Sequence, residues 1–146
     1  MINKTYWEYL VWYSFFSFVI FASWEWIQTP FFIDITKDIN TIVWFRIHCT
    51  IGDMLILFFS ISGTSLVFRK INWILRPSKL HYLSVTIMGV AYTLFSEVRN
   101  VHILKSWGYS DLMPKIFGIG LIPIIQWLLL PALILYILSR FHINKN

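Results

Sequence analysis

Charged side chains are scarce in this chain: only 13% of its 146 residues are Asp, Glu, Lys or Arg, whereas 58% are hydrophobic. A soluble domain of ordinary composition carries about 25% charged residues. The scarcity therefore argues against a soluble domain and predicts a membrane protein with several spans. An aromatic content of 19% agrees with this prediction, because Trp and Tyr rings gather at the level of the lipid headgroups.

Several motifs are also missing. Cys49 is the single cysteine, which excludes an internal disulfide and a metal cage built from several cysteines. Its neighbour His48 cannot form a catalytic dyad with it, because adjacent side chains on a helix diverge by about 100°. The sequence contains no serine-hydrolase elbow, phosphate loop, dinucleotide fingerprint or lipidation motif. The Glu-x-x-His pairs of di-iron bundles are absent as well, so we predict no metal and no cofactor.

The net charge of +5 raises the question of nucleic-acid binding. Most basic residues, however, flank the apolar runs and do not form one solvated patch. A nucleic-acid partner is therefore not expected.

Four long apolar runs occupy most of the chain, at about residues 6–27, 42–68, 80–98 and 115–139. Each is long enough to cross about 30 Å of hydrocarbon as a helix. The runs are continuous and do not alternate, which favours helices over a barrel. We therefore predict an all-α fold, with residues 1–146 forming one transmembrane domain of four helices. The first run is too long for a signal peptide and lacks a good cleavage site, so it is expected to be a retained anchor.

The basic residues predict the orientation in the membrane. Seven lie at the termini or between the second and third runs, and four lie in the two opposite loops: Lys4, Arg69, Lys70, Arg76, Lys79, Arg140 and Lys145, against Lys37, Arg99, Lys105 and Lys115. The opposite loops also contain Asp34, Asp38 and Asp111. Because cytoplasmic loops are enriched in Lys and Arg, both termini should be cytoplasmic.

The polar residues inside the runs are the clearest functional signal. A charge near the middle of a bilayer costs about 3 kcal/mol on insertion scales, so such residues are expected to meet each other or a ligand. With the predicted orientation they all fall in the outer half of the bundle. Arg46, Thr50 and Asp53 share one helix face. These observations predict an outward-open cleft lined by Glu25, Arg46, Asp53, Glu97, Asn100 and Gln126.

Each residue has a predicted role and a structural alternative. Asp53 and Glu97 are the candidate acid–base or cation-binding groups. The candidate ligand-binding residues are Glu25, Arg46, His48, Asn100 and Gln126. Alternatively, Arg46 forms a structural ion pair with Glu97 or Glu25, and His48 is a packing residue. Gln126 lies between two prolines of the fourth run, Pro123 and Pro131, and could bond a carbonyl that one of them frees.

Part of the sequence resembles a known group. The residues concerned are His48-Cys49-Thr50, Gly52-Asp53, Ala91-Tyr92-Thr93, Ser96-Glu97, Asn100, Trp107-Gly108-Tyr109-Ser110, Met113-Pro114, Gly120-Leu121, Pro123, Gln126-Trp127 and Pro131. They resemble a family of small four-span bacterial inner-membrane proteins over roughly the last two thirds of the chain. The resemblance implies a location in the bacterial inner membrane and implies no particular reaction.

Three functions fit the predicted cleft. The first is binding of a small polar or amphiphilic, lipid-like ligand. The second is an intramembrane enzyme that uses its carboxylates for acid–base chemistry on a lipid or isoprenoid. The third is an accessory subunit whose polar residues pack against a larger membrane complex. Passage of protons or cations is disfavoured, because the inner half of every run is almost purely apolar.

Overall fold

The computed structural model describes residues 4–33 and 38–143. It contains four long helices: α1 (Lys4–Ile27), α2 (Ile39–Phe68), α3 (Lys79–Glu97) and α4 (Leu121–Ile143). The predicted all-α class is therefore confirmed. Asp34, Lys37 and Lys145, which enter the charge argument for orientation, lie outside the described residues.

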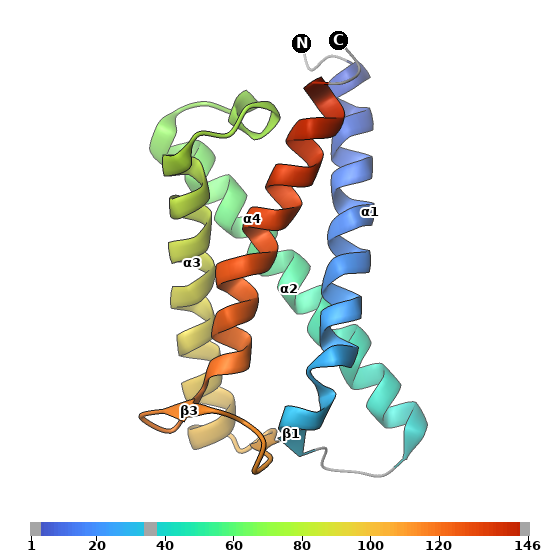
Figure 1. The fold of residues 1–146 in the computed structure, drawn as a ribbon, viewed down its shortest axis with the longest axis vertical. Helices are drawn as coiled ribbons and strands as arrows, with labels where there is room; N and C mark the ends of the chain where they lie inside the picture. Colours follow the sequence, from blue (N-terminus) through green and yellow to red (C-terminus); the bar gives the residue numbers. More distant parts are fainter. Residues whose placement is uncertain (1–3, 34–37, 144–146) are drawn as a thin grey trace.

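The four helices form a closed bundle in which each packs against two others. Helices α1 and α3 lie on opposite sides, and each packs against both α2 and α4. The start of α1 and the end of α4 lie at the same end of the bundle (Figure 1). Helix α2 crosses obliquely behind the other three, so its distance from α3 changes along its length (Figure 1).

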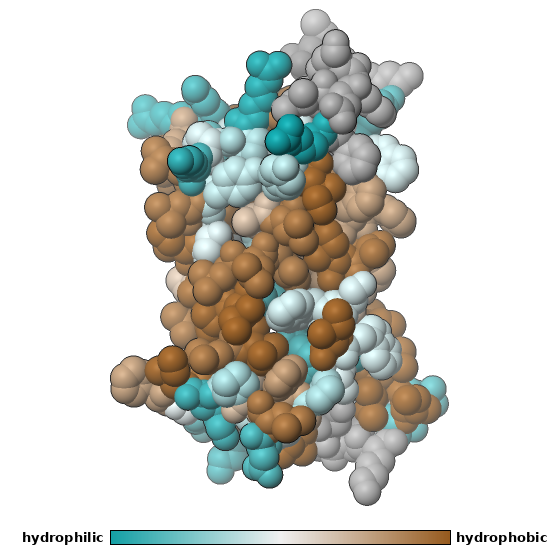
Figure 2. Space-filling view, in the orientation of Figure 1, coloured by the Kyte–Doolittle hydropathy of each residue, from teal (hydrophilic) through white to brown (hydrophobic). Residues whose placement is uncertain are grey.

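Three of the described helices are long and apolar enough to cross a membrane: α1 from Leu10 to Ile27, the whole of α2, and α4 from Leu121 to Arg140. Helix α3 is shorter and includes Lys79, His81 and several hydroxyl side chains. Large apolar side chains are exposed on the outer surface, among them Phe58 and Leu66 on α2. On the face shown in Figure 2, hydrophobic residues cover most of the middle of the molecule, with hydrophilic residues at both ends. This is the surface expected of helices that face lipid.

The bundle end near the start of α1 is closed by the connection from α2 to α3. This connection contains the 3₁₀ turn η2 (Asn72–Leu75), in which Trp73 and Ile74 are buried. The Trp73 indole stacks on the His81 ring with centroids 4.8 Å apart and donates to Ser65 Oγ at 2.8 Å. Helices α2 and α3 are close here, since the hydroxyls of Thr64 and Ser84 are 2.9 Å apart.

The opposite end carries short irregular elements. The turn η1 (Thr29–Phe31) leads into β1 (Phe32–Ile33), which pairs antiparallel with β2 (Gly108–Tyr109). The π-helix η3 (Val98–Ile103) extends α3. A small hairpin of β3 (Lys115–Ile116) and β4 (Ile119–Gly120) precedes α4.

This hairpin corrects the predicted start of the fourth helix. We predicted a span from about residue 115, but α4 begins at Leu121. Phe117 and Gly118 have φ values of 52° and 79°, which a continuing right-handed helix excludes. Pro123 consequently lies in the first turn of α4, where it removes no intrahelical hydrogen bond, and only Pro131 lies inside the helix.

The centre of the bundle depends on one close approach. A Cβ atom added to Gly89 of α3 would lie 2.0 Å from Cε3 of Trp127 on α4, so only glycine fits there. Trp127 is 1% exposed, and its ring also packs on Phe21 of α1 with centroids 5.8 Å apart. Trp127 thus joins three helices in the layer where the core meets the polar half of the molecule.

Candidate functional site

A cavity of about 680 Å³ lies in the half of the bundle near β1. All seven residues proposed from the sequence line it: Glu25, Arg46, His48, Asp53, Glu97, Asn100 and Gln126. They come from α1, α2, α3, η3 and α4. In Figure 2, hydrophilic atoms in this half are visible in a recess framed by hydrophobic ones.

The oblique course of α2 explains why the cavity is there. Helices α2 and α3 are in contact where a Cβ on Gly63 would lie 2.9 Å from Met88 Sδ. Beyond this contact the two helices diverge toward the end that carries β1 (Figure 1). The lining residues nearest this contact are Ser60, Met88 and Trp127, and the diverging segments add both polar side chains and apolar ones such as Phe45 and Ile56.

Two carboxyl groups meet at the centre of the site. Glu25 of α1 is 3% exposed, and its carboxyl group lies within hydrogen-bonding reach of the half-buried Asp53 carboxyl on α2. Two ionised carboxylates this close repel each other, so the arrangement requires a proton or another cation between them.

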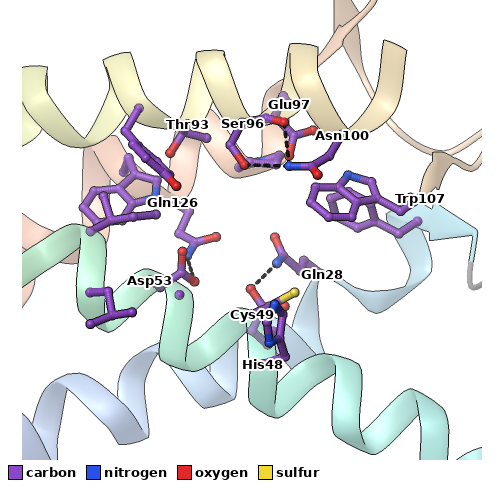
Figure 3. Close-up of a pocket in the computed structure, with 18 of the residues that line it drawn as sticks. Gln28, His48, Cys49, Asp53, Thr93, Ser96, Glu97, Asn100, Trp107 and Gln126 are labelled. Carbon is purple, nitrogen blue, oxygen red and sulfur yellow. Dashed lines mark hydrogen bonds between the residues drawn. The ribbon is translucent and has the colours of Figure 1, made fainter. Parts of the chain in front are cut away.

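Each of these carboxyl groups is held by a glutamine. Gln126 Nε2 of α4 donates to Asp53 Oδ2 at 2.6 Å, and Gln28 Nε2 donates to Glu25 Oε1 at 2.6 Å (Figure 3). The side-chain carbonyl of Gln28 in turn accepts a hydrogen bond from Trp24 Nε1 at 2.9 Å, which fixes the orientation of the Gln28 side-chain amide. Gln126 therefore bonds a carboxyl group of α2, in contrast to the alternative that it bonds a backbone carbonyl freed by a proline.

Arg46 is the buried cation of the site, at 6% exposure. Its charge attracts the Glu25 carboxylate. Thr50 Oγ1 donates to the Arg46 backbone carbonyl at 2.8 Å. Arg46 and Asp53, which were predicted to share a helix face, both line the cavity. Of the two partners considered for Arg46 in the sequence, the structure favours Glu25.

Glu97 belongs to a different part of the cavity wall. It is the last residue of α3, is 5% exposed, and accepts a hydrogen bond from the Tyr109 hydroxyl on β2. The Trp107 side chain lies close to this carboxylate as well, but its Nε1 makes no hydrogen bond within the described residues. Burial, together with the bond to Glu97, raises the pKa of Tyr109 above its usual value, so the phenol stays protonated. Asp53 and Glu97, the two candidate acid–base or cation-binding groups, thus have separate partners.

Asn100 and His48 occupy less central positions. Asn100 Nδ2 donates to Ser96 O at 2.9 Å and to Ser96 Oγ at 3.1 Å, which stabilises the junction of α3 with η3. His48 borders the cavity but is exposed. His102 lies outside the cavity lining, and its Nε2 contacts the Gly118 carbonyl at 3.0 Å.

Three residues of the site were not predicted from the sequence. Gln28 and Trp107 line the cavity, and Tyr109 forms a hydrogen bond with Glu97. Gln28 follows Glu25 by three positions, a spacing that places two side chains on one helix face and could have revealed it. Tyr109 reaches Glu97 only because β2 pairs with β1, a contact that helical periodicity does not contain.

The chemistry of the lining is that of recognition and proton binding. It combines carboxyl groups, amides, one buried guanidinium and several aromatic rings. Within the described ranges, no three His, Cys, Asp or Glu side chains are grouped so that they could hold a metal ion. The known proteins compared with this chain, as family models, curated sequences and solved structures, include no match.

Proposed function

We propose that this chain is a multi-pass membrane protein whose outward-facing polar cavity binds a small polar or amphiphilic ligand. The observation that carries the proposal is the convergence of seven polar residues from five elements on one cavity in an otherwise apolar bundle. Intramembrane ionisable groups are expensive, and their collection at one cavity is typical of a binding site.

In this proposal α3 is the fourth span. Its 19 residues reach about 28 Å as a helix, close to the thickness of the hydrocarbon core. The connection through η2 carries Arg69, Lys70, Arg76 and Lys79, which favours a cytoplasmic position for this end and for both termini. The bacterial inner membrane is proposed on the family resemblance described above.

Labelling of single cysteines tests this topology. In a Cys49→Ser background, we expect Asp111→Cys to react with a membrane-impermeant maleimide on intact bacteria. Asn72→Cys should react only after the cells are permeabilised, because η2 is placed on the cytoplasmic side. The reverse pattern would contradict the proposed orientation, and labelling of both sites on intact cells would contradict a spanning α3.

Ligand-dependent stabilisation tests the site itself. Protein purified in a mild non-ionic detergent is analysed by native mass spectrometry for retained lipids and small molecules, and whatever is retained is added back in thermal unfolding assays. We expect Asp53→Asn and Glu97→Gln to abolish the stabilisation while leaving membrane insertion intact. The matched controls are Asp111→Asn and Glu8→Gln, which make the same chemical changes at exposed positions. Normal binding by both cavity variants would refute the proposal.

An intramembrane enzyme is the second candidate, favoured by the Glu25 and Asp53 carboxyl pair. A pair that shares a proton can donate and accept protons beside an apolar substrate. An enzyme would convert the retained lipid during incubation, whereas a binding protein would return it unchanged. An accessory subunit would instead co-purify in fixed ratio with a larger complex under the same conditions.

A further inference from the structure

We infer that the ligand is a cationic amphiphile, with its positive headgroup against the Glu25 and Asp53 carboxyl pair and its apolar tail passing between α2 and α3 into the lipid. This inference rests on the proposed binding function and names the chemical class of the ligand. It is based on the charge of the cavity, on an unsatisfied hydroxyl in its wall and on the position of its opening.

The ionisable groups of the cavity do not balance. Three carboxyl groups line it, two of them buried, whereas Arg46 is its one buried guanidinium among the described residues. When ionised, these three carboxyl groups outnumber Arg46. Arg99 also borders the cavity, but its side chain is exposed at the end of the bundle, where solvent screens its charge. A ligand with a positive charge would restore the balance in a region where unpaired charge is costly.

A hydroxyl in the cavity wall provides independent evidence for a bound group. Thr93 of α3 is 5% exposed and lines the cavity, and its Oγ1 has no hydrogen-bond partner in the described part of the chain. Figure 3 shows Thr93 on the wall opposite Asp53, with Gln126 beside Asp53. A buried hydroxyl without a hydrogen-bond partner costs about 1–3 kcal/mol, so a ligand or a water molecule is expected to form a hydrogen bond with Thr93 Oγ1.

The opening of the cavity has apolar edges. Leu55 and Phe59 of α2 and Tyr92 of α3 all line the cavity, yet they are 53%, 66% and 50% exposed. These side chains therefore form both the cavity wall and the outer surface of the bundle, which places an opening between α2 and α3. Because α2 faces lipid elsewhere along its length, this opening gives an apolar tail a path to the hydrocarbon.

The opposite wall suits a positively charged headgroup. Trp107 projects into the cavity across from the carboxyl pair (Figure 3). Indole rings attract ammonium groups, and the attraction increases when water is excluded.

Binding of four probes with the same 12-carbon tail tests the inference. Native mass spectrometry of the detergent-purified protein gives apparent Kd values for dodecyltrimethylammonium, dodecylphosphocholine, dodecyl maltoside and dodecyl sulfate, each below its critical micelle concentration. We expect the trimethylammonium probe to bind at least tenfold more tightly than the maltoside, and the sulfate to bind most weakly. Tetramethylammonium, which has no tail, should bind at least tenfold more weakly than its dodecyl analogue.

Two substitutions assign the effect to the carboxyl pair. Glu25→Gln and Asp53→Asn should each weaken binding of dodecyltrimethylammonium at least tenfold and leave binding of the maltoside unchanged. Glu8→Gln, on the exposed part of α1, should change neither. If Glu25→Gln fails to fold because its site is buried, the half-buried Asp53 still provides the test through Asp53→Asn.

The outcomes separate the inference from the function on which it rests. Equal binding of all head groups, unaffected by either substitution, would overturn the cationic headgroup and leave a binding cavity in place. Tight binding of tetramethylammonium would overturn the lateral path for the tail. If wild-type protein bound none of the probes, the cationic headgroup and the lateral path would both be overturned, whereas the proposed binding function would be decided by the retained-ligand experiment above.

Discussion

Replacement of Gly89 by alanine is the most direct test of how the bundle is held together below the cavity. The added Cβ would lie 2.0, 2.6 and 2.8 Å from three atoms of the Trp127 ring. Carbon atoms in contact are about 3.5 Å apart, so α3 and α4 would have to separate by about 1.5 Å or the ring would have to move. The ring cannot move freely, because Trp127 is 1% exposed and packs on Phe21.

The expected loss of stability follows from two opposing terms. Overpacking of a well-packed core costs about 1–3 kcal/mol of stability. Because the added Cβ would overlap the Trp127 ring severely, we expect a cost near ~3 kcal/mol from the clash alone. Alanine recovers up to about 1 kcal/mol relative to glycine in a helix. Gly89→Ala should therefore lower the free energy of unfolding by about 2 kcal/mol.

Unfolding in mixed micelles, followed as SDS is added, measures this free energy. Gly52→Ala is the matched control, because a Cβ at Gly52 of α2 meets no atom within 4 Å. The control should gain up to about 1 kcal/mol from helix propensity alone, which makes the two variants differ by about 3 kcal/mol. Equal stability of Gly89→Ala and Gly52→Ala would refute the close approach of α3 to Trp127.

Three further substitutions test the two ends of the bundle. Wild-type protein should lose stability above pH 10, because unfolded tyrosine ionises at its usual pKa of 10.0 while burial keeps the folded Tyr109 phenol protonated. Tyr109→Phe should make that loss shallower in unfolding titrations from pH 9 to 12. Asp38 accepts hydrogen bonds from Thr41, which lowers the pKa of this carboxyl, so its stabilising effect is present at neutral pH and lost in acid below about pH 3.8. Asp38→Ala should speed hydrogen exchange in the first turn of α2 at pH 7, and equal rates would contradict the cap. Ser65→Ala removes the acceptor of the buried Trp73 indole and should cost about 1–3 kcal/mol in the same SDS titration.

The helices could be predicted from the sequence because apolar runs of this length leave few alternatives. The first three predicted runs differ from α1, α2 and α3 by a few residues at most. The fourth was predicted to start too early because Ile116, Phe117 and Ile119 are as hydrophobic as a helix requires. Hydrophobicity does not reveal that Phe117 and Gly118 adopt positive φ and turn the chain.

The partners within the site were harder to predict than its members. Helical phase places residues of one helix on one face, and so it brought Arg46 and Asp53 together correctly. It contains no information on how far one helix is rotated or shifted relative to another. For this reason the sequence did not show that Asp53 meets Glu25 and Gln126, or that a tyrosine in a short strand bonds Glu97.

The depth of the cavity distinguishes binding from passage. On α2, α3 and α4, the lining residues nearest the η2 end of the bundle are Ser60, Met88 and Trp127. Beyond that level the space between the helices is filled by a core that includes Val85, Ile134, Leu135 and Leu138, each 1% exposed or less. The stacked rings of Trp73 and His81 then close the far end of the bundle. An ion that reached Asp53 would face this close-packed apolar layer, where an uncompensated charge costs several kcal/mol or more. The carboxyl pair therefore lies at the end of an entrance, which suits a site that holds a ligand and releases it to the side from which it came.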